Sequence, residues 1–400
     1  MVKAGGYAKA KAKGRSLWWR VHSWAGLKLA IFMTFVLATG TLAVFAHEID
    51  WLVTPAMRAS PQDGPSVSWG TLAAAATRAE PHGRLQIIYA PIDPWFTAEV
   101  LMDTGEGAPR RVYVDPWSGR VTGTHGWANV HRFLRQVHRH LMLPTKIGIP
   151  IVSSLAFLLL ASLITGIVTY KKWWRGFFRL PKGGDARKLS GDLHRLGGLW
   201  SLWFVALIAL TGMWYLVETL GGRAPVPGLA EVRSAAAVPT GAELDRLIAG
   251  ARRERPSLDI REIRFTQKNG VVLLGQEHAW LVRDRANEVA VDPADGRILT
   301  SLDGTDLDAH QRIAEMADPL HFGTFGGLVT KALWFLFGLV LTGMSGTGVI
   351  IYAKRLQKAE KGQRTARRIA WAGMGAYAYV GIALILLALA LTPSAIGGAS

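Results

Sequence analysis

The chain has 400 residues, half of them hydrophobic, and its 46 Lys and Arg against 29 Asp and Glu give a net charge of +17. It contains no cysteine. This excludes disulfides, thiolate zinc sites, iron–sulfur clusters, covalently attached haem and a cysteine nucleophile, so any metal or redox cofactor must be held by His, Met or oxygen ligands. The 16 Trp residues and the long apolar runs point to a membrane rather than to nucleic acid as the partner.

Five apolar runs are long enough to cross a bilayer, which takes about 20 residues. They are Leu29–Ala46, Ile147–Thr169, Leu196–Val217, Ala332–Ala353 and Ile369–Leu391. The lysine-rich start and the first run also resemble a secretory signal with a cleavage site at Val44-Phe45-Ala46. The apolar part of such signals has only about 7–15 residues. We therefore interpret the first run as a retained helix.

The distribution of charge predicts the orientation. Residues 1–20, 171–195 and 354–368 hold 21 basic and 3 acidic residues, so they account for the whole basic excess. The positive-inside rule places these short segments in the cytoplasm. The long segments, roughly 48–130 and 220–320, are then extracytoplasmic, and the basic residues are topological signals rather than a nucleic-acid surface.

The two halves of the chain share one pattern, which indicates an internal repeat. The matching pieces are His22 to Thr39-Gly40 and His194 to Thr211-Gly212, Thr165-Gly166 and Thr347-Gly348 near the ends of later runs, and the Asp-Pro-x-x-Gly turns at Asp115 and Asp292. The repeated unit is a helix, an outer module and a second helix. The fifth helix stands outside it.

The predicted fold is an α-helical membrane protein with five transmembrane helices, arranged as a tandem repeat of helix, outer α+β module and helix, plus one C-terminal helix. The expected segments are a cytoplasmic tail (1–21), helix one (22–47), module 1 (48–130), an outer extension with helix two (131–170), a basic loop (171–193), helix three (194–219), module 2 (220–320), helix four (321–353), a second basic loop (354–368), helix five (369–392) and a periplasmic tail (393–400).

Each outer module is expected to hold one helix followed by strands. Module 1 has a helix at Ser68–Glu80, with Ser68 as N-cap, and strands at Leu85–Tyr89, Trp95–Leu101 and Arg111–Val114. Module 2 has a helix at Ala242–Arg253 and strands at Ile260–Thr266, Val271–Gly275, Trp280–Arg283 and Glu288–Val291. The Asp-Pro turns are expected to be structural, because Pro fixes φ and Gly accepts a positive φ.

Histidines in or near a span are candidates for function, because an unpaired imidazole there is costly. His22 and His194 occupy equivalent positions, as two axial ligands of one iron would. Gly26 and Gly198, four residues on, would let a flat macrocycle approach the helix. The alternative is that the histidines are interfacial anchors and the glycines are helix-packing contacts.

A second group of histidines precedes helices two and four. It comprises His131, His138, His140, His310 and His321, and His47 closes helix one at the same level. Spacing to the Thr-Gly pairs matches His321 with either His138 or His140. Two sets of histidines at opposite surfaces suggest a transmembrane electron path with two metal centres. The alternative for the outer set is a wet, protonatable interface.

The residues around these helices resemble the PepSY-associated transmembrane family of bacterial inner-membrane proteins, which includes iron-regulated ferric-siderophore reductases. The resemblance covers residues 20 to about 355 and is carried by His22-Ser23-Trp24-Ala25-Gly26-Leu27, Leu193-His194-Arg195, Val137-His138-Arg139, Leu320-His321 and the Thr-Gly pairs. It implies periplasmic PepSY-like modules and non-covalent haem b, two groups in all, held by His22, His194, His138 and His321. A family preference for Leu-His-Arg favours His138 over His140, although Val137 replaces the leucine here. His47, His131 and His140 are weaker candidates.

The resemblance implies an inner-membrane reductase that passes electrons to a periplasmic ferric siderophore. No nucleotide-binding motif occurs in the sequence, so the electrons must come from a partner, either a cytoplasmic flavin reductase or the quinone pool. The ferric chelate is expected in a cleft between the modules, near His138 and His321. The alternative is a non-catalytic PepSY protein that binds or regulates a periplasmic partner; a transporter is a weaker third interpretation, since the five spans hold no acidic relay.

Overall fold

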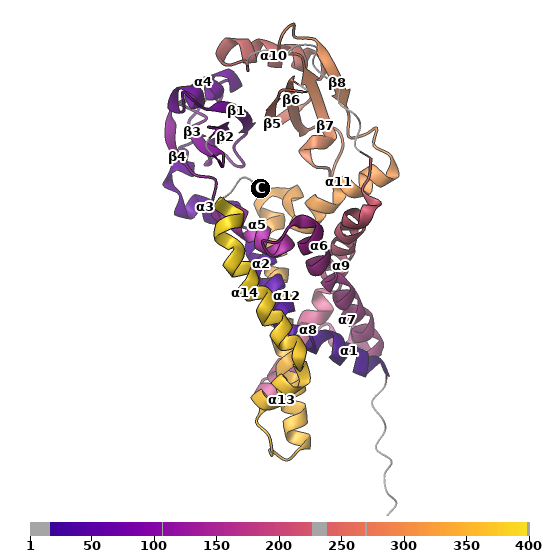
Figure 1. Ribbon diagram of the computed structural model, residues 1–400. Helices are drawn as coiled ribbons and strands as arrows, with labels where there is room; N and C mark the ends of the chain where they lie inside the picture. Colours follow the sequence, from indigo (N-terminus) through magenta and orange to yellow (C-terminus); the bar gives the residue numbers. More distant parts are fainter. Residues whose placement is uncertain (1–16, 106, 226–237, 269, 398–400) are drawn as a thin grey trace, which may run out of the picture.

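The computed structural model describes residues 17–105, 107–225, 238–268 and 270–397. Figure 1 shows two parts: a bundle of long helices and, at one end of it, a domain built on a β-sheet. The first sixteen residues and residues 398–400, which hold most of the predicted cytoplasmic tail and the end of the periplasmic tail, lie outside the described residues.

The bundle contains helices that are long and apolar enough to span a membrane. Within the described residues there are four such spans, at Thr145–Thr169, Leu202–Gly222, Thr324–Ala359 and Ala376–Ala395, or five if a bent pair of helices counts as one span. That pair is α1 (Leu17–Leu27) and α2 (Ala30–Ala43), which meet at an angle of 63°. The protein is therefore a membrane protein with several spanning helices, and the first predicted span is bent near its N-terminal end.

Three of the other predicted spans each consist of two consecutive helices with a short break between them, and one is a continuous helix. Their bounds are α6 (Thr145–Ser153), α7 (Leu155–Thr169), α8 (Ala186–Trp200), α9 (Leu202–Val217), α12 (Gly327–Ala359), α13 (Ala366–Met374) and α14 (Ala376–Gly397). The predicted fifth helix is broken at Gly375, which has a φ of +61°. Helix α7 packs against α1 and α9, and α12 packs against α8 and α2. Arg132 donates a hydrogen bond to the carbonyl of Ala395, so α14 ends beside α5 (Val130–His140).

The outer segments form one continuous antiparallel sheet of eight strands. Its strands are β1 (Arg84–Tyr89), β2 (Ala98–Asp103), β3 (Arg110–Val114), β4 (Val121–His125), β5 (Asp259–Thr266), β6 (Gly270–Gln276), β7 (Asn287–Val291) and β8 (Ile298–Leu302). Their order is β4-β3-β2-β1-β5-β6-β7-β8. The two modules join where Ile88 of β1 pairs with Ile263 of β5. The predicted modules are thus halves of one sheet rather than separate bodies.

Two helices cover one face of this sheet and enclose its main core: α4 (Trp69–Ala79) and α10 (Gly241–Glu254). Ser68 caps α4 by accepting a hydrogen bond from the amide of Thr71, as predicted. The helices meet at Gly70, where a Cβ would clash with the carbonyl of Gly241. Asp245 of α10 accepts hydrogen bonds from the Gly70 amide and the Ser68 hydroxyl. These contacts tie the two modules together on the helical side as well.

The predicted strands agree with the structure except at three places. Trp280–Arg283 was expected to be a strand and is a loop that leads into a short 3₁₀ helix at Asp284–Ala286. Strands β4 and β8 were not expected. Both follow the Asp-Pro turns, in which Asp115 and Asp292 accept amide hydrogen bonds two residues on. The turns reverse the chain, so the short, half-exposed segments behind them pair as edge strands.

Candidate functional site: two histidine pairs

The structure brings His22 of α1 and His194 of α8 together at the end of the bundle away from the sheet. Their ring centroids are 6.2 Å apart and the rings are nearly perpendicular, at 87°. The two residues are 172 positions apart in the sequence, so only the packing of the bundle places them side by side. The pair takes one histidine from each half of the chain.

Each of these histidines is held by the helix that packs against its own. Nδ1 of His22 lies 3.1 Å from the carbonyl oxygen of Ser162 and 3.1 Å from the hydroxyl of Thr165. Nδ1 of His194 lies 3.1 Å from the hydroxyl of Thr347. A carbonyl only accepts hydrogen bonds, so Nδ1 of His22 carries the proton. The Thr347 hydroxyl donates to the carbonyl of Met344 and is free to accept from His194 in the same way.

A second pair lies at the sheet end of the bundle. We call it the outer pair, and we call His22 and His194 the inner pair. His138 of α5 (Val130–His140) and His321 of α11 (Ala309–Phe322) have ring centroids 6.3 Å apart and an interplanar angle of 36°. Nδ1 of His138 donates to the carbonyl of Val36 at 2.9 Å. Nδ1 of His321 lies 2.7 Å from the hydroxyl of Thr211, which itself donates to Leu207.

All four histidines therefore have the same protonation pattern. Nδ1 is the donor, which leaves the lone pair of Nε2 as the free ligand atom. Among the described residues, none of the four Nε2 atoms makes a hydrogen bond. Burial lowers the pKa of His138, and burial together with the nearby His138 ring lowers the pKa of His321 to about 4. The outer pair is consequently neutral at pH 7 and able to bind a metal.

The spacing of both pairs fits two imidazoles that share one iron. Metal–nitrogen bonds of about 2.0 Å, with about 1.1 Å from each nitrogen to its ring centre, separate the centroids of opposed imidazoles by about 6.2 Å. The two pairs measure 6.2 Å and 6.3 Å. The residues present thus fit bis-histidine ligation of a haem at each end of the bundle.

Glycines contact three of the four rings, and one of them is needed to leave room. A Cβ on Gly40 would lie 2.5 Å from Cε1 of His138, whereas a Cβ on Gly166 or Gly348 would lie 3.5 Å from Cε1 of His22 or His194, an ordinary contact distance. The Thr-Gly pairs, which in the sequence only marked the repeat, therefore contact the histidines through a threonine hydroxyl, a glycine or both. Their recurrence at fixed distances from the histidines was the signal that could have identified this role.

The weaker candidates lie elsewhere. His47 and His131 stack on each other, with centroids 3.9 Å apart, too close for an iron between them. His140 hydrogen-bonds through Nδ1 to the carbonyl of Leu143 at the end of α5. The structure thus brings His138, and not His140, to His321.

The two glycines predicted to face a macrocycle differ in their surroundings. A Cβ on Gly26 would meet nothing within 4 Å, whereas a Cβ on Gly198 would lie 3.2 Å from Cε of Met344. Gly26 is exposed and borders open space, so its predicted contact with a macrocycle stays a prediction. Gly198 packs against α12, as the alternative of a helix-packing glycine predicts.

A recess of about 420 Å³ lies between the two modules. Trp69, Asp93 and Trp117 line it from module 1, and Arg252 and Arg261 from module 2. This matches the expected cleft in its place between the modules. Neither His138 nor His321 lines it, so it does not by itself bring a ligand to the outer pair.

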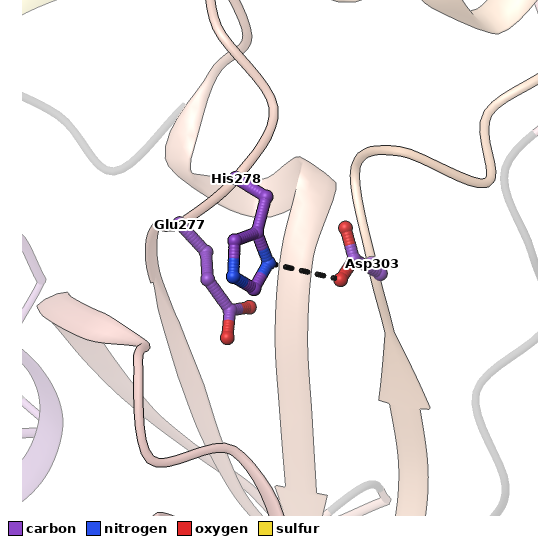
Figure 2. A group of neighbouring side chains, drawn as sticks. All are labelled: Glu277, His278 and Asp303. Carbon is purple, nitrogen blue, oxygen red and sulfur yellow. Dashed lines mark ion pairs between the residues drawn. The ribbon is translucent and has the colours of Figure 1, made fainter.

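A further cluster of potential metal ligands lies at the edge of module 2, where Glu277, His278 and Asp303 converge (Figure 2). The guanidinium of Arg255 forms ion pairs with both carboxylates, and Ser257 donates a hydrogen bond to Glu277. One guanidinium bridges both carboxylates, so we interpret the cluster as a structural cross-link.

The fold and the two pairs define a multi-spanning membrane protein with an extramembrane sheet domain and paired histidines at both ends of its bundle. Residues 19–355 match the family described as the PepSY-associated TM region. The chain belongs to this family, as its sequence motifs indicated. No curated protein matches it.

Proposed function

We propose that this protein is a haem-containing reductase of the bacterial inner membrane, built on a tandem repeat, that passes electrons outward to a periplasmic ferric siderophore. The observation that supports this most is the presence of two histidine pairs at opposite ends of the bundle, each with the spacing of bis-histidine iron ligation. When bound, haem b would supply a one-electron couple between ferric and ferrous iron.

The chain itself contributes ligands, orientation and insulation. The Nδ1 hydrogen bonds fix the ring orientation and the tautomer, and they raise the basicity of Nε2. In the inner pair, both rings are held by threonines on spanning helices. Eighteen residues separate His22 from Gly40, which contacts His138, so the helix path between the two pairs is about 27 Å long. The 63° bend between α1 and α2 lies on this path and makes the direct separation of the two pairs shorter.

The outer pair has polar surroundings suited to exchange with solvent. Asp318 lies one helical turn before His321 and accepts hydrogen bonds from Tyr215 and Arg283. Arg135 lies at the matching position before His138 and is exposed. A bulky, polar ferric chelate cannot enter the bilayer. It therefore meets the outer site from the sheet side, where reduction of Fe(III) to Fe(II) weakens its hold on the metal.

Topology reporters test the direction. The basic segments are expected in the cytoplasm, so fusions at Gly183 and Lys361 should report cytoplasmic locations. Fusions at Gly107 and Gly241 should report periplasmic ones. A periplasmic signal at Gly183 would place the sheet domain in the cytoplasm and contradict the proposed substrate face.

Spectroscopy tests the function. Purified protein should show b-type bands that dithionite reduces and that ferric siderophore reoxidises within a stopped-flow trace. His138→Ala should abolish the fast reoxidation. The matched control is His140→Ala, two residues further along the same helix, which should keep the fast reoxidation. A colourless protein would instead favour the non-catalytic alternative, in which the sheet binds a periplasmic partner. Haem with unchanged reoxidation in His138→Ala would place the electron exit elsewhere.

A further inference from the structure

An open recess of about 480 Å³ lies at the end of the bundle farthest from the sheet, between the start of α8 and the end of α12. Its lining residues are Asp185, Ala186, Arg187, Lys354, Gln357, Lys358, Lys361 and Gly362. The size falls within the range of about 300–1,000 Å³ that is usual for small-molecule sites.

The recess is strongly cationic. Four of its eight lining residues are basic, namely Arg187, Lys354, Lys358 and Lys361, and one is acidic. Within the described residues, none of these four cations forms an ion pair or a side-chain hydrogen bond. The acidic residue, Asp185, is occupied as the N-cap of α8, where it accepts a hydrogen bond from the amide of Lys188 at 2.9 Å. The nearby Glu360 pairs with Arg364.

The electrostatics of Asp185 agree with this arrangement. The hydrogen bond from the Lys188 amide lowers the pKa of Asp185, and the charges of Arg187 and Lys358 lower it further. The cations thus act on one point from both helices. Four unpaired cations around one recess form a site for an anion with several oxygen atoms.

The recess lies directly below the inner histidine pair. Arg187 precedes His194 by seven residues on α8, and Lys354 follows Thr347, the hydrogen-bond partner of His194, by seven residues on α12. Seven residues are close to two full helical turns, so each cation lies on the same helix face as the group above it, about 10 Å away. The same spacing on both helices aligns the recess with the inner pair.

General positive-inside charge does not explain this convergence. Lys171 and Lys172 follow the end of α7, the first-half counterpart of the end of α12, and they carry the same topological signal. Neither lines the recess. Among the residues that the structure describes, the cations that line the recess come from the second half of the chain, on α8, α12 and the loop after α12.

We propose that this recess binds the phosphate group of the cytoplasmic electron donor, a reduced flavin mononucleotide. This inference rests on the proposed function, because it assumes that electrons enter at the inner pair. Lys and Arg side chains bind the phosphate, which holds the flavin ring near His194. One reduced flavin gives up two electrons and two protons and becomes oxidised flavin; the two electrons reduce two ferric chelates in succession.

Binding of oxidised flavin mononucleotide tests the site without any electron transfer. Protein in nanodiscs of neutral phosphatidylcholine should quench the fluorescence of the flavin as the flavin binds. Lys354→Glu and Arg187→Glu should each weaken binding at least tenfold, because a repulsive charge replaces an attractive one. Lys171→Glu is the matched control and should bind like the unaltered protein. Riboflavin, which lacks the phosphate, should bind at least tenfold more weakly.

The other source of a phosphate is a lipid headgroup. If anionic phosphatidylglycerol in the nanodiscs is enriched around the unaltered protein but not around Lys354→Glu, and flavin mononucleotide binds both equally, the recess is a lipid site and the proposal is wrong. Equal binding of riboflavin and flavin mononucleotide would also overturn it. Haem content and reoxidation of dithionite-reduced protein by ferric siderophore, measured on the same samples, report on the proposed function separately. Loss of flavin binding in a variant with full haem content excludes misfolding.

Discussion

The two halves of the chain build the same elements in the same order but support them differently. Each half supplies one histidine to the inner pair and one to the outer pair. In the first half, His138 sits on Gly40 and bonds to a backbone carbonyl; in the second, His321 bonds to a threonine hydroxyl, and the equivalent Gly212 faces Ala156 instead. Equivalent sequence positions thus set the overall site, while local packing decides how each ring is held.

The largest expected effect tests whether the two halves of the chain each supply one ligand to the same haem. If the halves share each site, His22→Ala and His194→Ala should both remove the same one of two haem equivalents, because each leaves a single ligand. The outer haem should remain, since its ligands lie on other helices. Haem content by the pyridine method and the loss of one of two redox steps would check this. If either variant keeps both equivalents, the pairing of α1 with α8 does not bind haem.

The second prediction compares two equivalent glycines, Gly40 in the first half of the chain and Gly212 in the second half. In Gly40→Ala the new Cβ would lie 2.5 Å from His138, so the ring must move and its bond to Val36 is lost. Overpacking of this kind costs about 1–3 kcal/mol, and we expect the affinity for the outer haem to fall at least tenfold. In Gly212→Ala the new Cβ would lie 3.2 Å from Ala156, and the affinity should change by less than threefold. Haem titration of the two apoproteins measures both; equal effects would mean that the glycine contact does not position the ring.

A third prediction concerns the two modules. Arg111 of β3 and Glu288 of β7 occupy equivalent strand positions, three residues before the valines that precede the Asp-Pro turns. Arg111 forms an ion pair with Glu99 on the neighbouring strand. The residue that matches Glu99 beside Glu288 is Val272, and Oε1 of Glu288 is buried without a hydrogen-bond partner. One module therefore buries a paired charge and the other an unpaired carboxyl.

Burial raises the pKa of Glu288 to about 7 from an ordinary value near 4.5. The folded state then binds the proton more tightly than the unfolded state, so stability is greatest below about pH 4.5 and falls as the pH rises towards 7. Glu288→Gln should remove this loss and raise the stability of the sheet domain at pH 8 by roughly 2–3 kcal/mol. Thermal unfolding followed by circular dichroism at pH 5 and pH 8 tests it, with Glu243→Gln on the surface of α10 as control. A gain of the same size at both pH values would show that charge is not the cause.

Much of this fold could be predicted from the sequence, because apolar run length and charge asymmetry act locally. The spans and the core strands of both modules followed from such patterns. The bend between α1 and α2 and the joining of the modules through β1 and β5 did not, since both depend on contacts between distant segments. The edge strands β4 and β8 were missed because their half-exposed residues show little hydrophobic alternation.

The histidine pairs illustrate the same division. The duplicated pattern singled out His22, His194 and His321, but spacing alone left His138 and His140 as alternatives. Their side chains point to different sides of α5, and only the packing of α5 against α2 brings His138 onto Gly40. The role of the threonines could not be predicted from the sequence pattern either. Each hydroxyl forms a hydrogen bond with a histidine on another helix, and the sequence does not show which helices are neighbours.

The smallest expected effect tests how each half tunes its ring in the inner pair. His22 has two acceptors for its Nδ1 proton, Ser162 and Thr165, whereas the threonine hydroxyl of Thr347 is the hydrogen-bond partner of His194. Removing an acceptor makes the imidazole less basic, which stabilises ferric iron less and raises the midpoint potential. We expect Thr347→Val to raise the potential of the inner haem by about 20–40 mV, which corresponds to roughly 0.5–1 kcal/mol for one hydrogen bond. Thr165→Val should raise it by less than half as much, because Ser162 still accepts the proton. Potentiometric titration of the two variants, with Thr→Ser replacements as rescue, measures the difference. Equal shifts would show that the two halves support their histidines alike, and a fall in potential would contradict the donor role of Nδ1.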